Sequence, residues 1–182
     1  IEIMNSSFDH FKDEPFIKNR ITDLYMDRNN HVMWIGTFGK GMLKSSLSDD
    51  DIDRIYLNDG ICNVNGVVED AHGYIWLTTN HMGVWRSTSN VVSPKMKFER
   101  WERSSKDSYY CMFEDESGQL WLGGEEGTVY QINPFTDQVT SYHPTYDGVN
   151  SIGSINKIYF CIHNRLWLDQ FRCDKICPPS RE

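Results

Sequence analysis

Residues 31–37 read HVMWIGT, and the pattern of a tryptophan between two apolar residues returns three more times in the chain. The further copies are GYIWLTT at 73–79, GQLWLGG at 118–124 and NRLWLDQ at 164–170. The successive tryptophans are 42, 45 and 46 residues apart: Trp34, Trp76, Trp121 and Trp167. Self-similarity at such a period is typical of supersecondary units that stack to bury a shared core.

A β-hairpin is predicted around each of the first three tryptophans. A β-prone run precedes each one and ends in an aspartate: Asp27, Asp70 or Asp115. Three residues after each aspartate comes Asn30, Gly73 or Gly118. An aspartate that opens a turn bonds its own backbone, and Gly or Asn tolerates the left-handed geometry that such turns require. Two short apolar-patterned runs around so brief a polar joint predict a hairpin.

Two further strands follow each hairpin. A second joint leads through Gly41, Gly83 or Gly127 into a third short strand. Fourth strands are predicted at IDRIYLN (52–58), MKFERWE (96–102) and QVTSYHP (138–144). No helical periodicity competes with this pattern. Small four-stranded sheets must pack on one another to bury their faces, so the chain is predicted to be all-β, a β-propeller of about four four-stranded blades.

The tryptophans are predicted to fill the gaps between adjacent blades, since each sits at the same phase of a second strand and buries ~150–250 Å². The glycines are interpreted as turn residues rather than a phosphate cradle, because no G-x-G-x-x-G in a βαβ context is present.

The last repeat lacks a predicted strand, and the chain begins with a strand-like segment that belongs to no complete repeat. The last repeat supplies INKIYF, NRLWLDQ and a short third strand that is expected to end at Arg172, but no fourth strand, whereas FDHFKDE at 8–14 resembles the fourth strands of the others. This leading segment completes either the last blade, which closes a four-bladed ring and hides a sheet edge, or a preceding blade of a larger propeller. The second alternative is preferred. The propeller is expected over residues 1–171, with an irregular tail at 172–182.

Composition limits the classes of function. The formal net charge of −8 argues against a nucleic-acid partner, since phosphate binding needs clustered Lys and Arg. No apolar stretch approaches the ~20 residues of a membrane span. The start, IEIMNSSF, lacks the layout of a secretion signal, so in an exported protein the signal is removed or lies upstream.

No catalytic or metal motif emerges, and no cofactor is expected. The five cysteines cannot all pair within the chain, and the spacing of Cys173 and Cys177 supports zinc only weakly. In SDDDIDR (48–54) the calcium-loop pattern fails at Arg54 and Gly60. The six histidines form no close pair and no G-x-S-x-G is present. The adjacency of Glu125 and Glu126 says nothing in favour of glycosidase chemistry.

ITDLYMDRNNHVMWIGTFGKGMLK resembles the two-component regulator propeller repeat, whose pattern is I-x-x-I/L-x-x-D-x-x-G-x-x-W-I-G-T-x-x-G-G-L. VNGVVEDAHGYIWLTTNHMGVWR and YYCMFEDESGQLWLGGEEGTVYQ match nearly as well, and the resemblance covers about residues 16 to 170. In the last repeat Cys161 replaces the aspartate and no glycine follows Trp167 at the expected distance.

The resemblance implies a segment of the periplasmic sensor region of a hybrid two-component histidine kinase. In that family consecutive propellers precede a β-sandwich module, a membrane crossing, a kinase and a response regulator. The segment is then not an enzyme itself, it reaches the membrane only through other segments, and its ligand is expected to be an oligosaccharide or another small molecule.

Binding residues are expected where the joints between second and third strands share one face with the connections between blades, since loops on a rigid face carry most binding sites. The candidates on the joints are Phe38, Lys40, Asn80, His81, Glu125 and Glu126. The candidates on the connections are Asn63, Asn65, Tyr109, Tyr146 and Asn150.

Two other classes of function stay open. One is a non-catalytic scaffold that contacts another protein or forms a homodimer. The other is a propeller lyase or hydrolase, which needs an acid/base set or metal that the sequence does not reveal.

Overall fold

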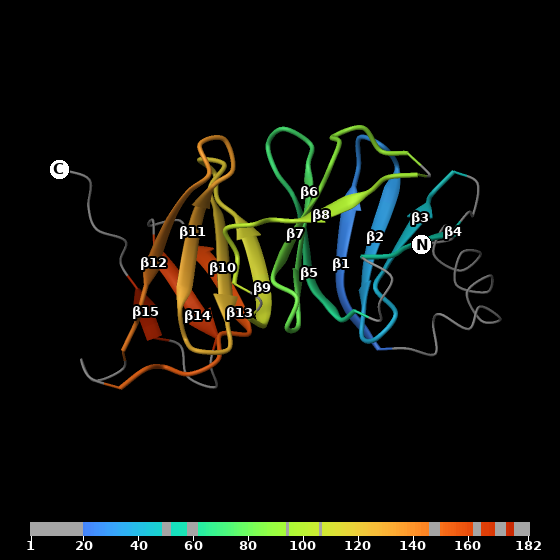
Figure 1. Cartoon of the computed structure of the whole chain (residues 1–182). Coiled ribbons are helices and arrows are strands. Elements are labelled where there is room, and N and C mark those ends of the chain that lie inside the picture. The colour runs from blue at the N-terminus through green and yellow to red at the C-terminus, as the bar shows by residue number, and fades with distance from the viewer. Residues whose placement is uncertain are drawn as a thin grey trace.

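The computed structural model describes residues 20–48, 52–57, 62–93, 95–105, 107–145, 150–161, 165–169 and 174–176. Within these ranges every regular element is a β-strand. The strands form four antiparallel meandering sheets, which follow one another in chain order and lie side by side (Figure 1). The predicted all-β propeller of repeated four-stranded blades is therefore confirmed, as a partial propeller.

The first three sheets each have four strands. Sheet 1 consists of β1 (Ile21–Asp27), β2 (Val32–Thr37), β3 (Met42–Ser46) and β4 (Ile52–Ile55). Sheet 2 consists of β5 (Val64–Glu69), β6 (Ile75–Thr79), β7 (Val84–Ser87) and β8 (Phe98–Arg100). Sheet 3 consists of β9 (Tyr109–Glu114), β10 (Leu120–Gly124), β11 (Val129–Asn133) and β12 (Gln138–Tyr142).

The fourth sheet has three strands in the described residues: β13 (Lys157–Cys161), β14 (Arg165–Asp169) and β15 (Asp174–Ile176). Its third strand falls inside the segment 172–182, which the sequence led us to expect as irregular. β15 pairs with β14 from Leu168↔Asp174 to Leu166↔Ile176, so the meander continues past the predicted boundary. The leading segment 1–19, with its predicted outer strand, lies outside the described residues.

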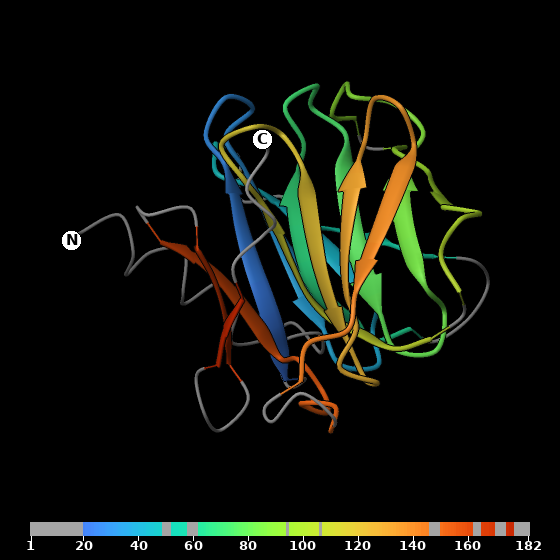
Figure 2. The same cartoon turned by 90° about the vertical axis from the view of Figure 1, so that its left-hand side faces the viewer.

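The first strand of each sheet lies innermost and contacts the first strand of the next sheet: β1 meets β5, β5 meets β9 and β9 meets β13. Figure 2 shows these first strands close together at the centre of the four sheets, and the later strands of each sheet lie farther out.

Three clusters of buried side chains hold neighbouring sheets together, and each is built around one tryptophan. Trp34 is fully buried with Val64 and Leu77 of sheet 2, and its ring meets Phe98 edge-on at 6.5 Å. Trp76 packs with Leu120 and other residues of sheet 3, and Trp121 packs against sheet 4. The predicted role between blades is confirmed for these three. The backbone of Trp167 pairs with Tyr159, and its side chain lies outside the described set.

Glycine at the seams has a role beyond turns. The inner cross-strand pairs Asp23↔Gly36 and Cys111↔Gly123 each contain one glycine. A Cβ on Gly123 would lie 2.8 Å from Cβ of Ile155 in the connection to sheet 4. The next sheet therefore approaches too closely for a second side chain at this level.

The first turn differs from its equivalents by one residue. Trp34 follows its turn aspartate by seven residues, whereas Trp76 and Trp121 follow theirs by six. The left-handed residue is accordingly His31, at φ 54°, and not Asn30 as the sequence pattern suggested. In the other two turns Gly73 and Gly118 are left-handed, as expected.

Candidate functional site

The loops between second and third strands and the connections between sheets lie on one face of the array, which we call the loop face. Gly41 donates its N–H to the carbonyl of Cys62, and Glu125 donates its N–H to the carbonyl of Ser108. The hydroxyl of Ser154 in turn reaches the carbonyl of Glu125 at 3.1 Å. The face runs along the lower edge of the sheets in Figure 1, and it is the face on which binding residues were expected.

A groove, which we call the loop groove, opens on this face between sheets 2 and 3. It consists of two neighbouring cavities that share Tyr109 and Tyr130 in their lining: an outer part of about 40 Å³ and an inner part of about 130 Å³. The outer part is lined by Asp107, Ser108, Tyr109, Gly124, Glu125, Glu126, Thr128 and Tyr130. The inner part adds Trp101, Arg103, Ser104, Ser105 and the apolar residues Val84, Leu122, Ile132 and Val139.

Two tyrosine rings separate the two parts of the loop groove. Tyr109 and Tyr130 meet edge to face, with centroids 5.7 Å apart. The Tyr109 hydroxyl is fixed by Ser105 Oγ at 2.8 Å, and Ser105 also bonds the carboxylate of Asp107. Burial raises the pKa of both tyrosines, and the nearby carboxylates of Asp107 and Glu126 raise the pKa of Tyr130 further. Both rings therefore stay neutral and can offer a polar edge to a ligand.

The rim of the groove is acidic. Asp107, Glu125 and Glu126 are all exposed and line the outer part. Carboxylate oxygens at a groove mouth accept hydrogen bonds from hydroxyl groups, and the apolar faces of rings pack against C–H groups. This combination suits a neutral ligand rich in hydroxyls and opposes an anion.

Asn80 and His81, in the β6–β7 loop of sheet 2, line neither part of the groove but are bonded to residues next to it. His81 Nδ1 lies 3.1 Å from Ser108 Oγ. The Asn65 amide donates to Oδ1 of Asn80 at 2.6 Å and to the carbonyl of Tyr109 at 2.8 Å, so one side chain ties sheet 2 to the inner strand of sheet 3.

His81 has a left-handed backbone with φ 57°, where the equivalent loop of sheet 1 has Gly39 at φ 82°. A side chain in this region is uncommon and costs conformational energy. The imidazole is thus held beside the groove in a loop where glycine would fit with less strain.

Of the candidates on the joints and connections, Tyr109, Glu125 and Glu126 line the loop groove, and Asn80 and His81 lie next to it through their bonds to Asn65 and Ser108. Tyr109 is only 3% exposed, so its ring belongs mainly to the core between sheets 2 and 3 and offers an edge, not the open stacking face that the sequence suggested.

Phe38 and Lys40 are exposed on the sheet 1 loop, and neither lines the loop groove. Asn63 contributes a backbone carbonyl to Asn80 N–H. Asn150 is exposed in the connection to sheet 4, and Tyr146 lies outside the described residues.

Sequence reasoning missed Tyr130, Asp107 and Ser105. Tyr130 stands in a third strand, where alternation alone marked it as a packing residue. Asp107 and Ser105 lie in the stretch SSKDS before Tyr109, whose polar composition indicated a loop without showing which way it folds. No group of metal-ligating side chains occurs among the described residues. The described residues also include no helix with the length and hydropathy of a membrane span.

Comparisons with known proteins agree with the repeat pattern. Residues 15–39 and 104–126 match the family described as two component regulator propeller. A comparison with curated proteins finds no match.

Solved structures share the fold. The extracellular domain of a hybrid two-component system from B. thetaiotaomicron is 22% identical over 85% of this chain, with a TM-score of 0.67. The extracellular domain of a one-component system from the same organism is 18% identical over 86% of the chain, also at 0.67. Virginiamycin B lyase from Staphylococcus aureus is 12% identical over 92% of the chain, at 0.68.

The chain spans 21% of the length of each sensor domain and 58% of the lyase. At these identities the likeness shows the fold alone. Residues 15–39 and 104–126 are thus similar to two-component regulator propeller repeats, and the four meanders show that the chain forms a partial β-propeller.

Proposed function

We propose that this chain is a ligand-sensing segment of the extracytoplasmic region of a two-component sensor, and that the loop groove binds a neutral oligosaccharide. The observation that carries the proposal is the loop groove between sheets 2 and 3. It is lined by Tyr109 and Tyr130 and has exposed acidic residues at its rim. The match to regulator propeller repeats and the sensor domains among the structural neighbours support the regulatory role.

The groove has the parts that such a ligand needs. The exposed Glu125 and Glu126 carboxylates accept from sugar hydroxyls. Charged acceptors form stronger hydrogen bonds than neutral ones, so the acidic rim would carry most of the selectivity for hydroxyl-rich ligands. We infer no bond-making step here, and the segment acts by binding.

Signalling would follow from differential affinity. A ligand shifts an equilibrium between two arrangements only by the ratio of its affinities for them. The Asn65 side chain bridges the Asn80 loop and the inner strand of sheet 3, so a ligand that contacts both walls favours one spacing of the two sheets. In the parent protein that preference would reach the further propeller and kinase modules.

The test is calorimetric titration of this chain with a panel of neutral oligosaccharides, since the groove is built from sheets 2 and 3 of the chain itself. Glu126→Gln should weaken binding about tenfold, because a hydrogen bond to a charged acceptor contributes about 1.5–3 kcal/mol. Glu116→Gln is the matched control, because Glu116 is exposed in the β9–β10 turn at the opposite end of sheet 3. Absence of binding across the panel, or equal affinity of the E126Q and E116Q variants, would contradict the proposal.

A further inference from the structure

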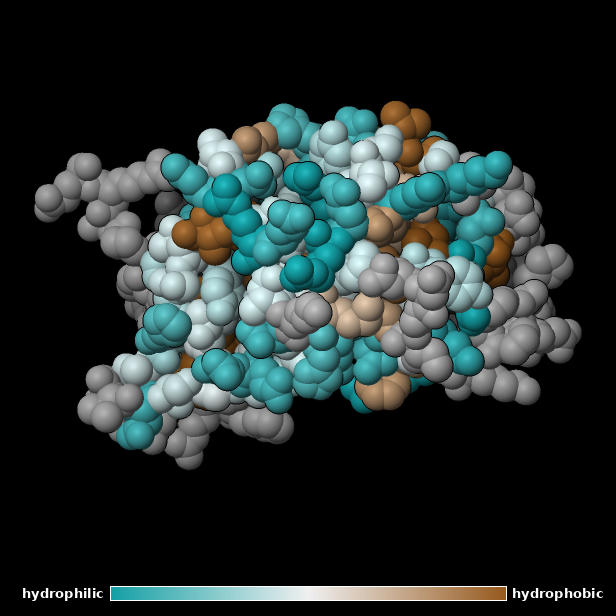
Figure 3. All heavy atoms as spheres, viewed as in Figure 1, coloured by the Kyte–Doolittle hydropathy of each residue, from teal (hydrophilic) through white to brown (hydrophobic). Residues whose placement is uncertain are grey.

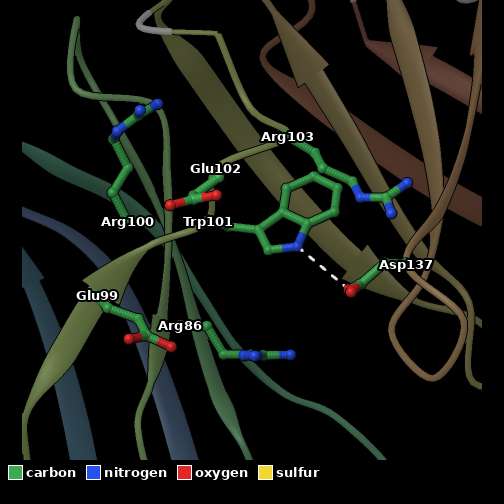
Figure 4. A pocket seen from close by; sticks show the side chains of 7 residues that line it. All are labelled: Arg86, Glu99, Arg100, Trp101, Glu102, Arg103 and Asp137. Carbon is green, nitrogen blue, oxygen red and sulfur yellow. Dashed lines mark hydrogen bonds between the residues drawn. The ribbon is translucent and has the colours of Figure 1, made fainter.

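A second and larger pocket, which we call the rim pocket, lies on the outer side of sheets 2 and 3. It holds about 380 Å³, which is within the ~300–1,000 Å³ of typical small-ligand sites. Three arginines, three carboxylates and Trp101 line it (Figure 4). Hydrophilic residues gather over the middle of the molecule, where the chain leaves β8 toward β9 (Figure 3).

The side chain of Arg86 in the rim pocket is held in one orientation by its aromatic neighbours. Its guanidinium carbon lies 5.3 Å from the centroid of Trp76 and 5.5 Å from that of Tyr74, so two rings hold the side chain in place. Stacking of this kind leaves the in-plane N–H groups of a guanidinium free to donate. Arg86 is therefore oriented before any ligand arrives.

Arg86 is half-buried, and its guanidinium lacks the acceptors that a cation in such a place usually has. Its Nε is buried without a hydrogen-bond partner in the described part of the chain, and no ion pair joins Arg86 to any described carboxylate. The cross-strand neighbour Glu99 does not take this role. In Figure 4 the Arg86 guanidinium extends away from Glu99, toward the space between Trp101 and Asp137. A buried donor that faces a cavity without an acceptor points to a missing acceptor.

The remaining residues of the rim pocket suggest what carries that acceptor. Trp101 is 8% exposed and gives only a long bond of 3.3 Å from Nε1 to Asp137 Oδ1. Glu99 and Glu102 are exposed carboxylates that can accept from hydroxyl groups. A planar carboxylate matches the fork of a guanidinium in bidentate geometry. One molecule with a carboxylate at one end and hydroxyls along its length satisfies both halves of the pocket.

We propose that the rim pocket binds a sugar acid, with its carboxylate paired to Arg86 and its hydroxyls facing Glu99 and Glu102. The site is independent of the loop groove: its cations select for an acid, whereas the acidic rim of the loop groove selects against one. Trp101 and Arg103 belong to the lining of both cavities.

The test uses D-glucuronate as the probe and D-glucose as its neutral counterpart, each titrated into the chain and followed by ¹H–¹⁵N NMR. Glucuronate should shift the indole N–H signals of Trp76 and Trp101 with saturation, and glucose should leave the signal of Trp76, which lines no part of the loop groove, unchanged. Arg86→Gln should weaken glucuronate binding at least tenfold. Arg28→Gln, an exposed arginine in the β1–β2 turn, is the matched control and should bind as the parent chain does.

Several results would overturn the proposal: no saturable shift of the two indole signals, an equal response of the Trp76 signal to glucose, an equal response of that signal to inorganic phosphate, or unchanged affinity in R86Q. If R86Q does not fold, the shifts in the parent chain decide the question together with Arg86→Lys. Lysine keeps the charge and loses the fork, so this variant should still show a several-fold loss. The outcome leaves the loop groove untested, because that site is probed by neutral oligosaccharides and E126Q.

Discussion

The indole N–H of Trp76 donates to the carboxylate of Asp70 over 2.8 Å, joining the residue at the centre of a seam to the turn that precedes its strand. The same 2.8 Å bond links Trp121 to Asp115. In sheet 1 the equivalent indole, Trp34, has no partner among the described residues, and the Asn30 side chain bonds Asp27 Oδ2 instead. Because the turn of sheet 1 has one more residue, the carboxylate of Asp27 accepts from a side-chain amide where Asp70 and Asp115 accept from an indole.

Asp70→Ala is expected to destabilise the fold more than Asp27→Ala. The Asp70 carboxylate accepts from the backbone N–H groups of His72 and Tyr74 as well as from the fully buried indole of Trp76. Leaving a buried donor unpaired costs about 1–3 kcal/mol, so the difference between the two variants should be about 1–2 kcal/mol, measured by urea denaturation. Asp115→Ala should behave like D70A. Equal losses for all three variants would show that the indole bond carries no stability.

Replacing the left-handed histidines by glycine should separate stability from binding. His31 and His81 have φ values of 54° and 57°, and glycine relieves the strain at either position. Both variants are expected to raise the unfolding free energy by up to about 1 kcal/mol. Only His81→Gly should weaken oligosaccharide binding, because His81 lies at the loop groove and His31 at the opposite end of sheet 1. Loss of binding in H31G would place the binding site elsewhere.

The pH dependence of stability should carry a signature of Glu69 and Glu114. Burial raises the pKa of both carboxyls; Asp27 adds to the shift of Glu69, and Asp70 to that of Glu114. Because the folded pKa lies above the unfolded value, their contribution is fully present below the ordinary pKa of about 4.5 and is lost as the pH rises through the raised folded pKa.

The Glu69→Gln/Glu114→Gln double variant should therefore gain stability relative to the parent chain as the pH is raised from about 4 to about 7. Urea midpoints across this range measure the difference. Glu99→Gln/Glu102→Gln is the control pair, since both residues are exposed on the outer side of sheet 2. A constant difference at every pH would mean that neither buried carboxyl resists ionisation.

Gly123→Ala should destabilise the contact between sheets 3 and 4. The added Cβ would lie 2.8 Å from Ile155 Cβ and 2.9 Å from Cys111 Sγ. Overpacking of this kind costs about 1–3 kcal/mol. The double variant with Ile155→Ala should lose less than the sum of the two single variants, as measured by thermal unfolding. Strict additivity would show that the two positions do not press on one another.

The repeat period predicted most of the fold because it records a packing requirement. A ring at Trp34, Trp76 or Trp121 is needed wherever one sheet faces the next, so the spacing of tryptophans gives the spacing of sheets. Details that depend on a single turn were less accessible. The identity of the left-handed residue changed from Asn30 to His31 because one extra residue shifts the turn. The short third strand of the last repeat was expected to end at Arg172, and β15 lies beyond that residue because pairing with β14 outweighs its polar sequence.

The candidate sites were harder to foresee than the fold. The loop face followed from topology, and it placed Glu125 and Glu126 correctly on an exposed joint. The burial of Tyr109 depends on Trp101 and Leu120, which reach it from different parts of the chain. The sequence did not predict the rim pocket, because the pocket forms only where the β11–β12 turn meets the end of β8.

The bonds between inner strands have a direction. Asp23 accepts the N–H of Val67 in the next sheet, and Asn65 and Cys111 reach backbone carbonyls of the sheets that follow. Removing the first sheet would leave the N–H of Val67 without its acceptor, and removing the segment that leads into the last would leave the carbonyl of Gly124 without the N–H of Ile155 that it accepts at 2.9 Å. Loss of either end sheet should therefore leave a main-chain group unpaired at the newly exposed seam, so the sheets should unfold together rather than one at a time.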